Sequence, residues 1–446
     1  MSFYIQVLDE LVDELVSRKD PHIAALASSE PEVASALLDA ARSLQNGTAT
    51  TQTLAQLDQV IQTAHTKIAS CTAAAQFGWR RFYTETSILR ALGGLTFCGD
   101  DVTEEAALAS VKALDSALII AAAPGEGRLD LIHELICQIQ SVNLKPASAS
   151  GRLLGGPSSR VGAYGPTPCG SDVPSLSSAP SFLSFQEQWS KTPFVLRRHV
   201  SDWPALTNHP WRSVEYLQSL AGPGRIVPVE VGADYRSDSW TQKLLDWDNF
   251  LSAISSRDDQ NPHSDDVLYL AQHNLMIQFP QLRDDIIIPD YVYSTLSPPH
   301  SFLQYKPPGN EEQLVINVWL GPAGAISPAH TDPYFNCYAQ VVGRKTVWLA
   351  PPEVTESMYP YAGKESSHPA ANHTNPSMSN TSRVDVFPRS KEMEERSREE
   401  HPAFWAEASR AALCTVLEPG DLLFFPPGWW HAMRSEETSF SVSMWF

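Results

Sequence analysis

Hydrophobic and polar positions follow a helical pattern over the first third of the chain. In residues 1–144, apolar side chains recur at intervals of three and four, as in FYIQVLDELVDELV (3–16) and LDLIHELICQIQ (129–140). This spacing places the apolar positions along one face of a helix. Runs such as QNGT and GEGR are typical of turns between helices. We therefore predict an N-terminal α-helical domain over residues 1–144.

A stretch rich in Gly, Ser and Pro interrupts this pattern at residues 145–180. Such a composition buries too little apolar surface to order itself, so we predict a flexible linker. Its glycines neither follow a predicted strand nor open a helix, which argues against a phosphate-binding loop.

From residue 181 onward the pattern mixes helices and strands, and we predict a second domain over residues 181–446. Its core, about residues 314–446, consists of short apolar or alternating segments separated by turn residues, which is typical of an all-β barrel. A polar insertion at about 353–412, which includes KEMEERSREE, interrupts the barrel and is predicted to be helical or disordered. The predicted barrel strands lie at LVINVWLG (314–321), NCYAQVVG (336–343), KTVWLAP (345–351), SRVDVF (382–387), CTVLEPG (414–420), DLLFFP (421–426) and SFSVSMWF (439–446).

His330 and Asp332 flank a single residue at the edge of a predicted strand. Residues i and i+2 of a strand point to the same face, so this imidazole and carboxylate can bind one ion side by side. His431 is the best third ligand, because it follows the turn and strand at PGDLLFFPPGWW (419–430) and precedes the last strand. Two histidines and one carboxylate are the metal ligands typical of non-haem Fe(II) oxygenases. They leave coordination positions of the ion open for a cosubstrate and dioxygen.

Lys345 opens the strand KTVWLAP, thirteen residues after Asp332. A lysine at such a position is usually a solvated edge charge. The alternative is that it points into the barrel, where it would need an anion such as the far carboxylate of a dicarboxylate cosubstrate.

Together these segments resemble the Jumonji-C (JmjC) oxygenases, and within them the branch of lysine-specific demethylase 8, also described as arginyl hydroxylase. The resemblance covers about residues 182–446, with a weaker similarity at GWRRFYTETSILRAL (78–92). It implies an α+β fold whose core is a double-stranded β-helix, a jelly-roll or cupin-like barrel, behind an N-terminal α-helical domain. The matching segments are VPVEVGADY (227–235), LYLAQHNL (268–275), IPDY (288–291), ISPAHTDP (326–333), VVGRK (341–345), NTSRVDV (380–386) and SFSVSMWF (439–446).

The resemblance also implies roles for individual residues. Fe(II) would be bound by the catalytic residues His330, Asp332 and His431. The cosubstrate 2-oxoglutarate would pair with Lys345. O2 would be the second cosubstrate and would react at the metal. Further contacts to 2-oxoglutarate are implied for Asn336, Ser327, Tyr269 and Gln272.

A substrate pocket is implied at Glu230, Trp240 and Trp319. A carboxylate and two indoles suit a guanidinium, which pairs with carboxylates and stacks on aromatic rings. The alternative is that both tryptophans are packed in the core and Glu230 lies on a rim. We therefore expect a 2-oxoglutarate-dependent dioxygenase that hydroxylates an arginine side chain of a basic protein. A histone methyl-lysine demethylase and a catalytically silent interaction module are the alternatives.

The charge of the chain bears on its partners. The net charge is −19, and residues 1–145 hold 10 basic and 18 acidic residues, leaving 22 and 33 for the rest. Neither part has a basic surplus, which argues against direct nucleic-acid binding and favours a basic protein or peptide partner.

Cysteine usage and hydropathy bear on location. The six cysteines lie far apart with no C-x-x-C spacing, as expected of reduced thiols rather than a zinc finger. No apolar run approaches the length of a membrane span, and the first residues do not resemble a leader peptide. We therefore expect a nuclear or cytoplasmic protein without membrane attachment.

Overall fold

The structure is a computed structural model that describes residues 2–17, 20–99, 101–146, 151–155, 167–237, 239–260, 267–361 and 378–446. The chain forms two compact units. The first joins residues 1–149 to the short segments 218–227 and 245–248. The second contains the remaining residues from 150 onward. Parts of the predicted linker and of the predicted insertion lie outside the described residues. The domain boundaries at 144 and 181 stay a prediction.

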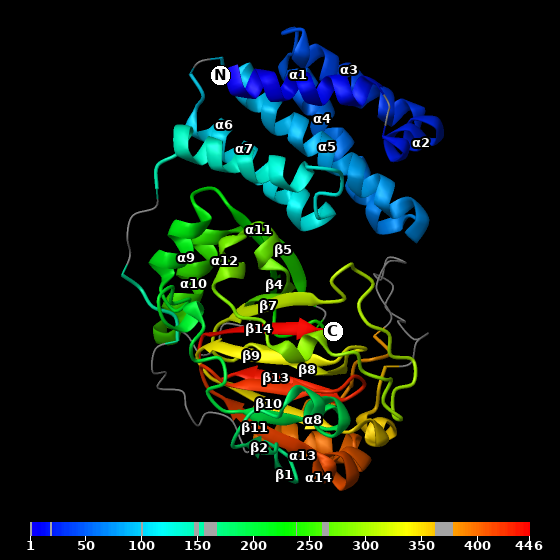
Figure 1. The fold of residues 1–446 in the computed structure, drawn as a ribbon, viewed down its shortest axis with the longest axis vertical. Coiled ribbons are helices and arrows are strands. Elements are labelled where there is room, and N and C mark those ends of the chain that lie inside the picture. Colours follow the sequence, from blue (N-terminus) through cyan, green and yellow to red (C-terminus); the bar gives the residue numbers. More distant parts are fainter. Residues whose placement is uncertain are drawn as a thin grey trace. The chain divides into compact units, whose positions relative to one another are not determined.

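Most of the first unit, from its N-terminus to the end of α7, is a group of packed helices, coloured from blue to cyan in Figure 1. The apolar periodicity of the sequence accounts for it, since α3 buries Leu37, Leu38, Ala41 and Leu44 at helical spacing. α6 begins at a side-chain cap, because the Thr103 hydroxyl accepts a hydrogen bond from the amide of Ala106. The helices are α1 (Ser2–Ser17), α2 (Pro21–Ser29), α3 (Pro31–Gln45), α4 (Thr51–Ser70), α5 (Ala73–Phe97), α6 (Glu104–Ser116), η1 (Ala117–Ala121) and α7 (Arg128–Asn143).

A buried ion pair joins segment 218–227 to the helices of the first unit. Nη2 of Arg225 lies 2.7 Å from Oδ1 of Asp115 on α6, and the two side chains are 5% and 0% exposed. The amide of Ile226 donates to the other carboxylate oxygen at 2.8 Å. A buried charge is tolerated only with such partners, so this contact fixes the segment in the helical unit.

The second unit is built around two β-sheets (Figure 1). One has the strand order β1-β11-β10-β13-β8, and the other β2-β3-β12-β9-β14-β7-β6-β4-β5. Strands from the two sheets face each other across an apolar core, so the predicted α+β fold with a jelly-roll barrel is confirmed. The strands are β1 (Ser171–Asp172), β2 (Ser175–Leu176), β3 (Phe194–Leu196), β4 (Ile226–Val231), β5 (Thr241–Asp246), β6 (Leu268–His273), β7 (Val315–Gly321), β8 (Ile326–Thr331), β9 (Asn336–Val342), β10 (Lys345–Ala350), β11 (Leu413–Leu417), β12 (Leu422–Phe425), β13 (Trp430–Ser435) and β14 (Ser439–Trp445).

Short helices connect and flank these strands. They are α8 (Phe182–Glu187), η2 (Trp189–Lys191), η3 (Pro204–Leu206), α9 (Val214–Ala221), α10 (Trp247–Gln260), α11 (Leu275–Gln278), α12 (Gln281–Asp284), η4 (Asp290–Tyr293), η5 (Pro352–Met358), α13 (Lys391–Glu400), η6 (Phe404–Ala408) and α14 (Ser409–Ala411). None of the helices in the described part of the chain is long and apolar enough to cross a membrane.

The barrel interior and its outer face have different linings. Val347 and Leu349 of β10 point inward, where they meet Tyr338 and Phe425 of the facing sheet. Trp348, one residue out of phase, points to the opposite side of β10 and packs in an outer cluster with residues of the insertion. Because side chains alternate along β10, one face of the strand lines the barrel interior and the other packs in the outer cluster.

Two expectations from the sequence differ from the structure. The predicted linker contains the ordered strands β1 and β2, because each pairs in parallel with a barrel strand, β11 and β3 respectively. The predicted strand at 382–387 does not form. Residues 381 and 382 make only isolated bridges, while Val384 and Val386 are buried in the outer cluster. Apolar alternation there reflects burial rather than a regular ladder.

Candidate active site

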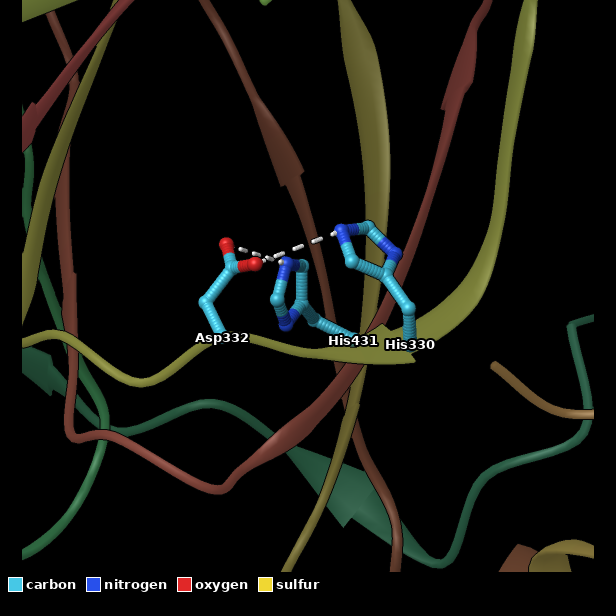
Figure 2. A group of neighbouring side chains, drawn as sticks. All are labelled: His330, Asp332 and His431. Carbon is cyan, nitrogen blue, oxygen red and sulfur yellow. Dashed lines mark ion pairs between the residues drawn. The ribbon is translucent and has the colours of Figure 1, made fainter. Parts of the chain in front are cut away.

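Three potential metal ligands converge at one end of the barrel (Figure 2). His330 lies near the end of β8, Asp332 follows that strand, and His431 lies on β13 directly opposite His330 in the register. Their ligand atoms all lie within 4.8 Å of one another. Nε2 of His431 is 3.4 Å from Oδ2 of Asp332, and Nε2 of His330 is 3.9 Å from Oδ1. Within the described residues, this is the one such group of histidine, cysteine and carboxylate side chains.

Backbone carbonyls orient both imidazoles. Nδ1 of His330 lies 2.8 Å from the carbonyl oxygen of Pro328, and Nδ1 of His431 lies 3.1 Å from that of Trp429. A carbonyl can only accept, so Nδ1 carries the proton in each ring. The Nε2 lone pairs therefore face Asp332, which is the arrangement that metal-binding histidines need.

The protonation of the group also suits a metal. Burial and the neighbouring His431 lower the pKa of His330 to about 4, so its ring is neutral at pH 7. Burial by itself would raise the pKa of Asp332, but its contacts with His431 and His330 hold the pKa below its ordinary value. A neutral His330 imidazole and the Asp332 carboxylate are therefore available as ligands near neutral pH.

A β-bulge in β8 decides which of its residues face the site. His431 pairs with His330, but two residues further along β13, Met433 pairs with Ser327, three residues back along β8. The extra residue shifts the alternation of β8. Ser327 and His330 consequently share the inward face, which regular strand geometry would forbid.

Lys345 lies at the far end of the same inward wall. It begins β10 opposite Ser435, while Leu349 of the same strand lies opposite His431. The side chain is 0% exposed, and Nζ donates to the hydroxyls of Tyr338 at 2.9 Å and Tyr269 at 3.3 Å. Burial lowers the pKa of this ammonium to about 7. Lys345 is thus an inward-facing cation and not a solvated edge charge.

The structure brings most of the predicted cosubstrate residues together around Lys345. The hydroxyl of Ser327 is a hydrogen-bond partner of the Tyr269 phenol, whose pKa burial raises. Asn336 begins β9 and is 2% exposed, and among the described residues its Oδ1 has no hydrogen-bond partner. Gln272 differs from these buried residues in its environment, because its side chain is exposed to solvent. It has φ 49° and lies within a bulge of β6.

Tyr338 is a member of this group that the sequence reasoning missed. It lies two residues after Asn336 on β9, and its hydroxyl is the nearer of the two that Lys345 contacts. The i, i+2 relation to Asn336 is the signal that would have placed it on the same face.

The predicted substrate residues lie around Tyr269. Glu230 of β4 is the register partner of Tyr269, and Oε2 of Glu230 accepts a hydrogen bond from Nε1 of Trp240 at 3.3 Å. Burial raises the pKa of Glu230 despite that bond. The Trp319 ring centroid lies 6.1 Å from that of Tyr269, and its Nε1 donates to Ser443 at 3.1 Å. All three predicted residues are partly exposed, so the carboxylate and the two indoles are not sealed in the core, and their role toward a substrate stays a prediction.

Comparisons with known proteins agree with this geometry. A family model described as a cupin-like domain matches residues 184–446. The chain is similar to lysine-specific demethylase 8 of Danio rerio, with 39% identity over 271 residues, or 60% of this chain and 56% of the relative. It is similar to Jumonji C domain-containing protein 5 of Drosophila melanogaster, with 37% identity over 277 residues, or 62% of this chain and 60% of the relative. These matches confirm the resemblance to Jumonji-C proteins.

A plant relative extends the comparison. Lysine-specific demethylase JMJ30 of Arabidopsis thaliana is 35% identical over 262 residues, or 57% of this chain and 50% of the relative. The chain thus spans about half to three fifths of the length of the curated relatives it matches.

Proposed function

Because the chain belongs to the cupin-like domain family, we propose that it is an Fe(II)- and 2-oxoglutarate-dependent JmjC oxygenase that removes methyl groups from lysine side chains of a basic protein. The observation that carries the proposal is the placement of His330, Asp332 and His431 at one end of a barrel wall and of the buried Lys345 at the other.

The donor set fits Fe(II). His330, Asp332 and His431 would hold the metal through two imidazole nitrogens and a carboxylate, the ligands of the facial triad of non-haem Fe(II) oxygenases. When bound, Fe(II) and 2-oxoglutarate supply oxidative decarboxylation coupled to hydroxylation of a substrate C–H bond.

The chain itself binds and orients the cosubstrate. Lys345 lies four positions before Leu349 on β10, which is about 13 Å of strand and suits a short extended dicarboxylate between the triad and the lysine. Lys345 would pair with the carboxylate farther from the metal, and the hydroxyls of Tyr269 and Tyr338 would complete its hydrogen bonds. Asn336 lies on the face of β9 that also carries Tyr338, and its Oδ1 has no hydrogen-bond partner among the described residues. Apolar Val347 and Leu349 exclude water from the wall between.

The names of the relatives bear on the substrate. Arginine hydroxylation, the first expectation from the sequence, has less support than methyl-lysine demethylation, because two of the relatives described above are named lysine-specific demethylases. Hydroxylation of an N-methyl carbon yields a carbinolamine, which breaks its C–N bond to release formaldehyde and the amine. The net negative charge of the chain favours a basic protein as the carrier of that lysine.

Arginine hydroxylation stays the second candidate because of Glu230. Its carboxylate is fixed by Trp240 next to Tyr269, where it could receive a guanidinium in bidentate fashion. A carboxylate also attracts a methylated ammonium, but without hydrogen bonds when the ammonium is fully methylated. Replacing Glu230 therefore separates the two candidates.

The test is mass spectrometry of methyl-lysine and arginine peptides after incubation with the protein, Fe(II), 2-oxoglutarate and air. Asp332→Ala is the blank, and Asp172→Ala, on the exposed edge strand β1, is a matched control that should behave as wild type. Loss of methyl groups from lysine, absent in the blank, is the expected result. Gain of one oxygen on arginine, abolished by Glu230→Gln, would instead establish hydroxylation. No change in either peptide and no succinate above the blank would leave an interaction module as the better explanation.

A further inference from the structure

The loop between β4 and β5 carries the substrate-side residues and has its own internal order. It runs from Gly232 to Trp240 and connects Glu230 to the indole that hydrogen-bonds it. Two turns shape its described residues: the amide of Ser237 donates to the carbonyl of Asp234 at 3.0 Å, and the amide of Trp240 donates to that of Ser237 at 3.1 Å. The position of Trp240 therefore depends on the residues at 234–237.

Arg236 connects this loop to a segment about 150 residues later in the chain. Its Nε and Nη2 each donate to one carboxylate oxygen of Asp234 at 3.0 Å, and its Nη1 donates to the carbonyl of Val384 at 3.1 Å. Oδ1 of Asp385 lies 3.9 Å from Nη2. The Arg236 side chain is 13% exposed and that of Asp234 16%, so solvent screens this charge pair little.

The later segment, residues 380–386, is fixed to the strand of the metal ligands. The carbonyl of Asn380 accepts from the amide of Thr331 at 2.9 Å, and the amide of Ser382 donates to the carbonyl of Ala329 at 2.8 Å. Between them, Thr381 forms a β-bridge with His330. Residues 380–382 are therefore held beside β8 by backbone hydrogen bonds and an isolated bridge, without forming a regular strand.

A second contact joins the loop to the same segment. The Tyr235 hydroxyl lies 3.5 Å from Oγ1 of Thr381, the residue that bridges His330. Tyr235 and Arg236 thus reach two neighbouring parts of segment 380–386 from adjacent positions in the loop. Two such contacts fix the orientation of the loop, whereas one would permit rotation about it.

From these contacts we propose that Arg236 is a positioning residue that holds the loop bearing Trp240 at a set distance from the strand bearing His330. The geometry of the opening between the indole and the metal ligands, and with it the fit of a cationic substrate side chain, would follow from this clamp. The role rests on the proposed function, since the substrate is the one assigned there. A guanidinium suits the task better than an ammonium, because it addresses a carboxylate and a carbonyl at once in a planar fork.

The test compares Arg236→Gln and Arg236→Lys with Arg197→Gln in the full-length chain. Arg197 is a matched control, because it also donates to a carboxylate, Asp421 at 2.6 Å, and to a backbone carbonyl, that of Val416 at 2.8 Å. The readouts are amide hydrogen exchange at residues 232–240, succinate made with Fe(II) and 2-oxoglutarate but no peptide, and KM and kcat for the peptide.

For Arg236→Gln we expect exchange in the loop to accelerate and KM for the peptide to rise about tenfold, with peptide-free succinate within about twofold of wild type. Arg236→Lys should recover part of the KM, and Arg197→Gln should leave exchange in the loop and KM unchanged. If amide hydrogen exchange in the loop, or KM for the peptide, were unchanged in a folded Arg236→Gln protein, the positioning role proposed for Arg236 would be wrong. If the amount of succinate made without peptide and the melting temperature fell together, Arg236 would also be wrong as a positioning residue, because its role would be structural only. If wild-type protein makes no succinate, the proposed function fails instead, which is a distinct outcome.

Discussion

Lys345 combines complete burial with contacts to two neutral hydroxyls, and this combination sets its protonation. In water a lysine stays charged, but burial here lowers the pKa to about 7. Near neutral pH the side chain therefore exists in both forms. Only the ammonium can pair with a carboxylate, so binding of a dicarboxylate is coupled to proton uptake at this residue.

This coupling predicts a pH dependence for 2-oxoglutarate binding. Below pH 7 Lys345 is already protonated and the Kd should be flat, whereas above pH 7 binding must take up a proton and should weaken by up to about tenfold per pH unit. Titration calorimetry of the Mn(II)-loaded protein in buffers of different ionisation enthalpy measures both the Kd and the proton uptake. A Kd that stays constant from pH 7 to 9 would contradict the assignment.

Replacement by methionine tests the cost of that buried charge. The folded-state pKa lies below the unfolded value, so the unfolded chain binds more protons between about pH 7 and 10.5 and wild-type stability should rise with pH across that window. Lys345→Met removes the penalty, and we expect a gain of about 1 to 3 kcal/mol at pH 7 that shrinks toward pH 10. Urea unfolding at the two pH values measures it. The variant should also lose 2-oxoglutarate binding, and a loss of stability at pH 7 would argue against a desolvated ammonium.

At the scale of the element, one sharp connection joins β9, which delivers Asn336 and Tyr338 from one sheet, to β10, which delivers Lys345 from the facing sheet. The turn between them contains Gly343, which has φ 65°. A Cβ at this position would overlap the carbonyl oxygen of Thr438, a backbone atom that cannot rotate away. The geometry of this connection, and with it the depth of Lys345 in the barrel, therefore depends on this glycine.

Gly343→Ala should consequently destabilise the protein by about 2 to 4 kcal/mol, through the strained backbone and the overlap. Gly309→Ala is the matched control, because a Cβ there meets no atom within 4 Å, and we expect a change within about 0.5 kcal/mol. Thermal unfolding compares the two. Equal melting temperatures for both variants would mean that the turn relaxes and does not set the path from β9 to β10.

At the scale of the whole molecule, the compact units do not follow the order of the chain. Segments 218–227 and 245–248 come after the first barrel-unit residues in sequence but belong to the helical unit. Two ion pairs make the connection to α6. Arg225 pairs with Asp115 in the interior, and Lys112 pairs with Asp246 at 2.8 Å with both side chains more than 40% exposed.

Burial makes these two pairs unequal in energy. Asp115→Ala leaves Arg225 charged in a dry environment and should cost about 3 to 5 kcal/mol, whereas Lys112→Ala at the surface should cost less than about 1 kcal/mol. Chemical denaturation followed by circular dichroism, which reports on the helices, measures both. A similar small effect for both variants would show that water reaches Arg225 in the native protein.

The local pattern of hydrophobic and polar residues by itself determined much of the secondary structure of this protein. Period-3.6 and period-2 hydrophobicity depends only on which side chains face a core, so the helices at 1–144 and most barrel strands could be predicted from it. The convergence of His330, Asp332 and His431 could be predicted as well, because His330 and Asp332 lie two positions apart in sequence and ligand chemistry limits the choice of a third group.

Pairing between strands that are distant in sequence decided the features of the site that the local pattern does not specify. The bulge that turns Ser327 to the side of His330 arises from hydrogen bonds between β8 and β13, about a hundred residues apart, and no local periodicity encodes it. The contact of Tyr338 with Lys345, the exposure of Gln272 and the clamp at Arg236 likewise depend on which strands lie side by side. Local preference specifies what each segment can form, whereas long-range burial and hydrogen bonding select which faces and charges meet.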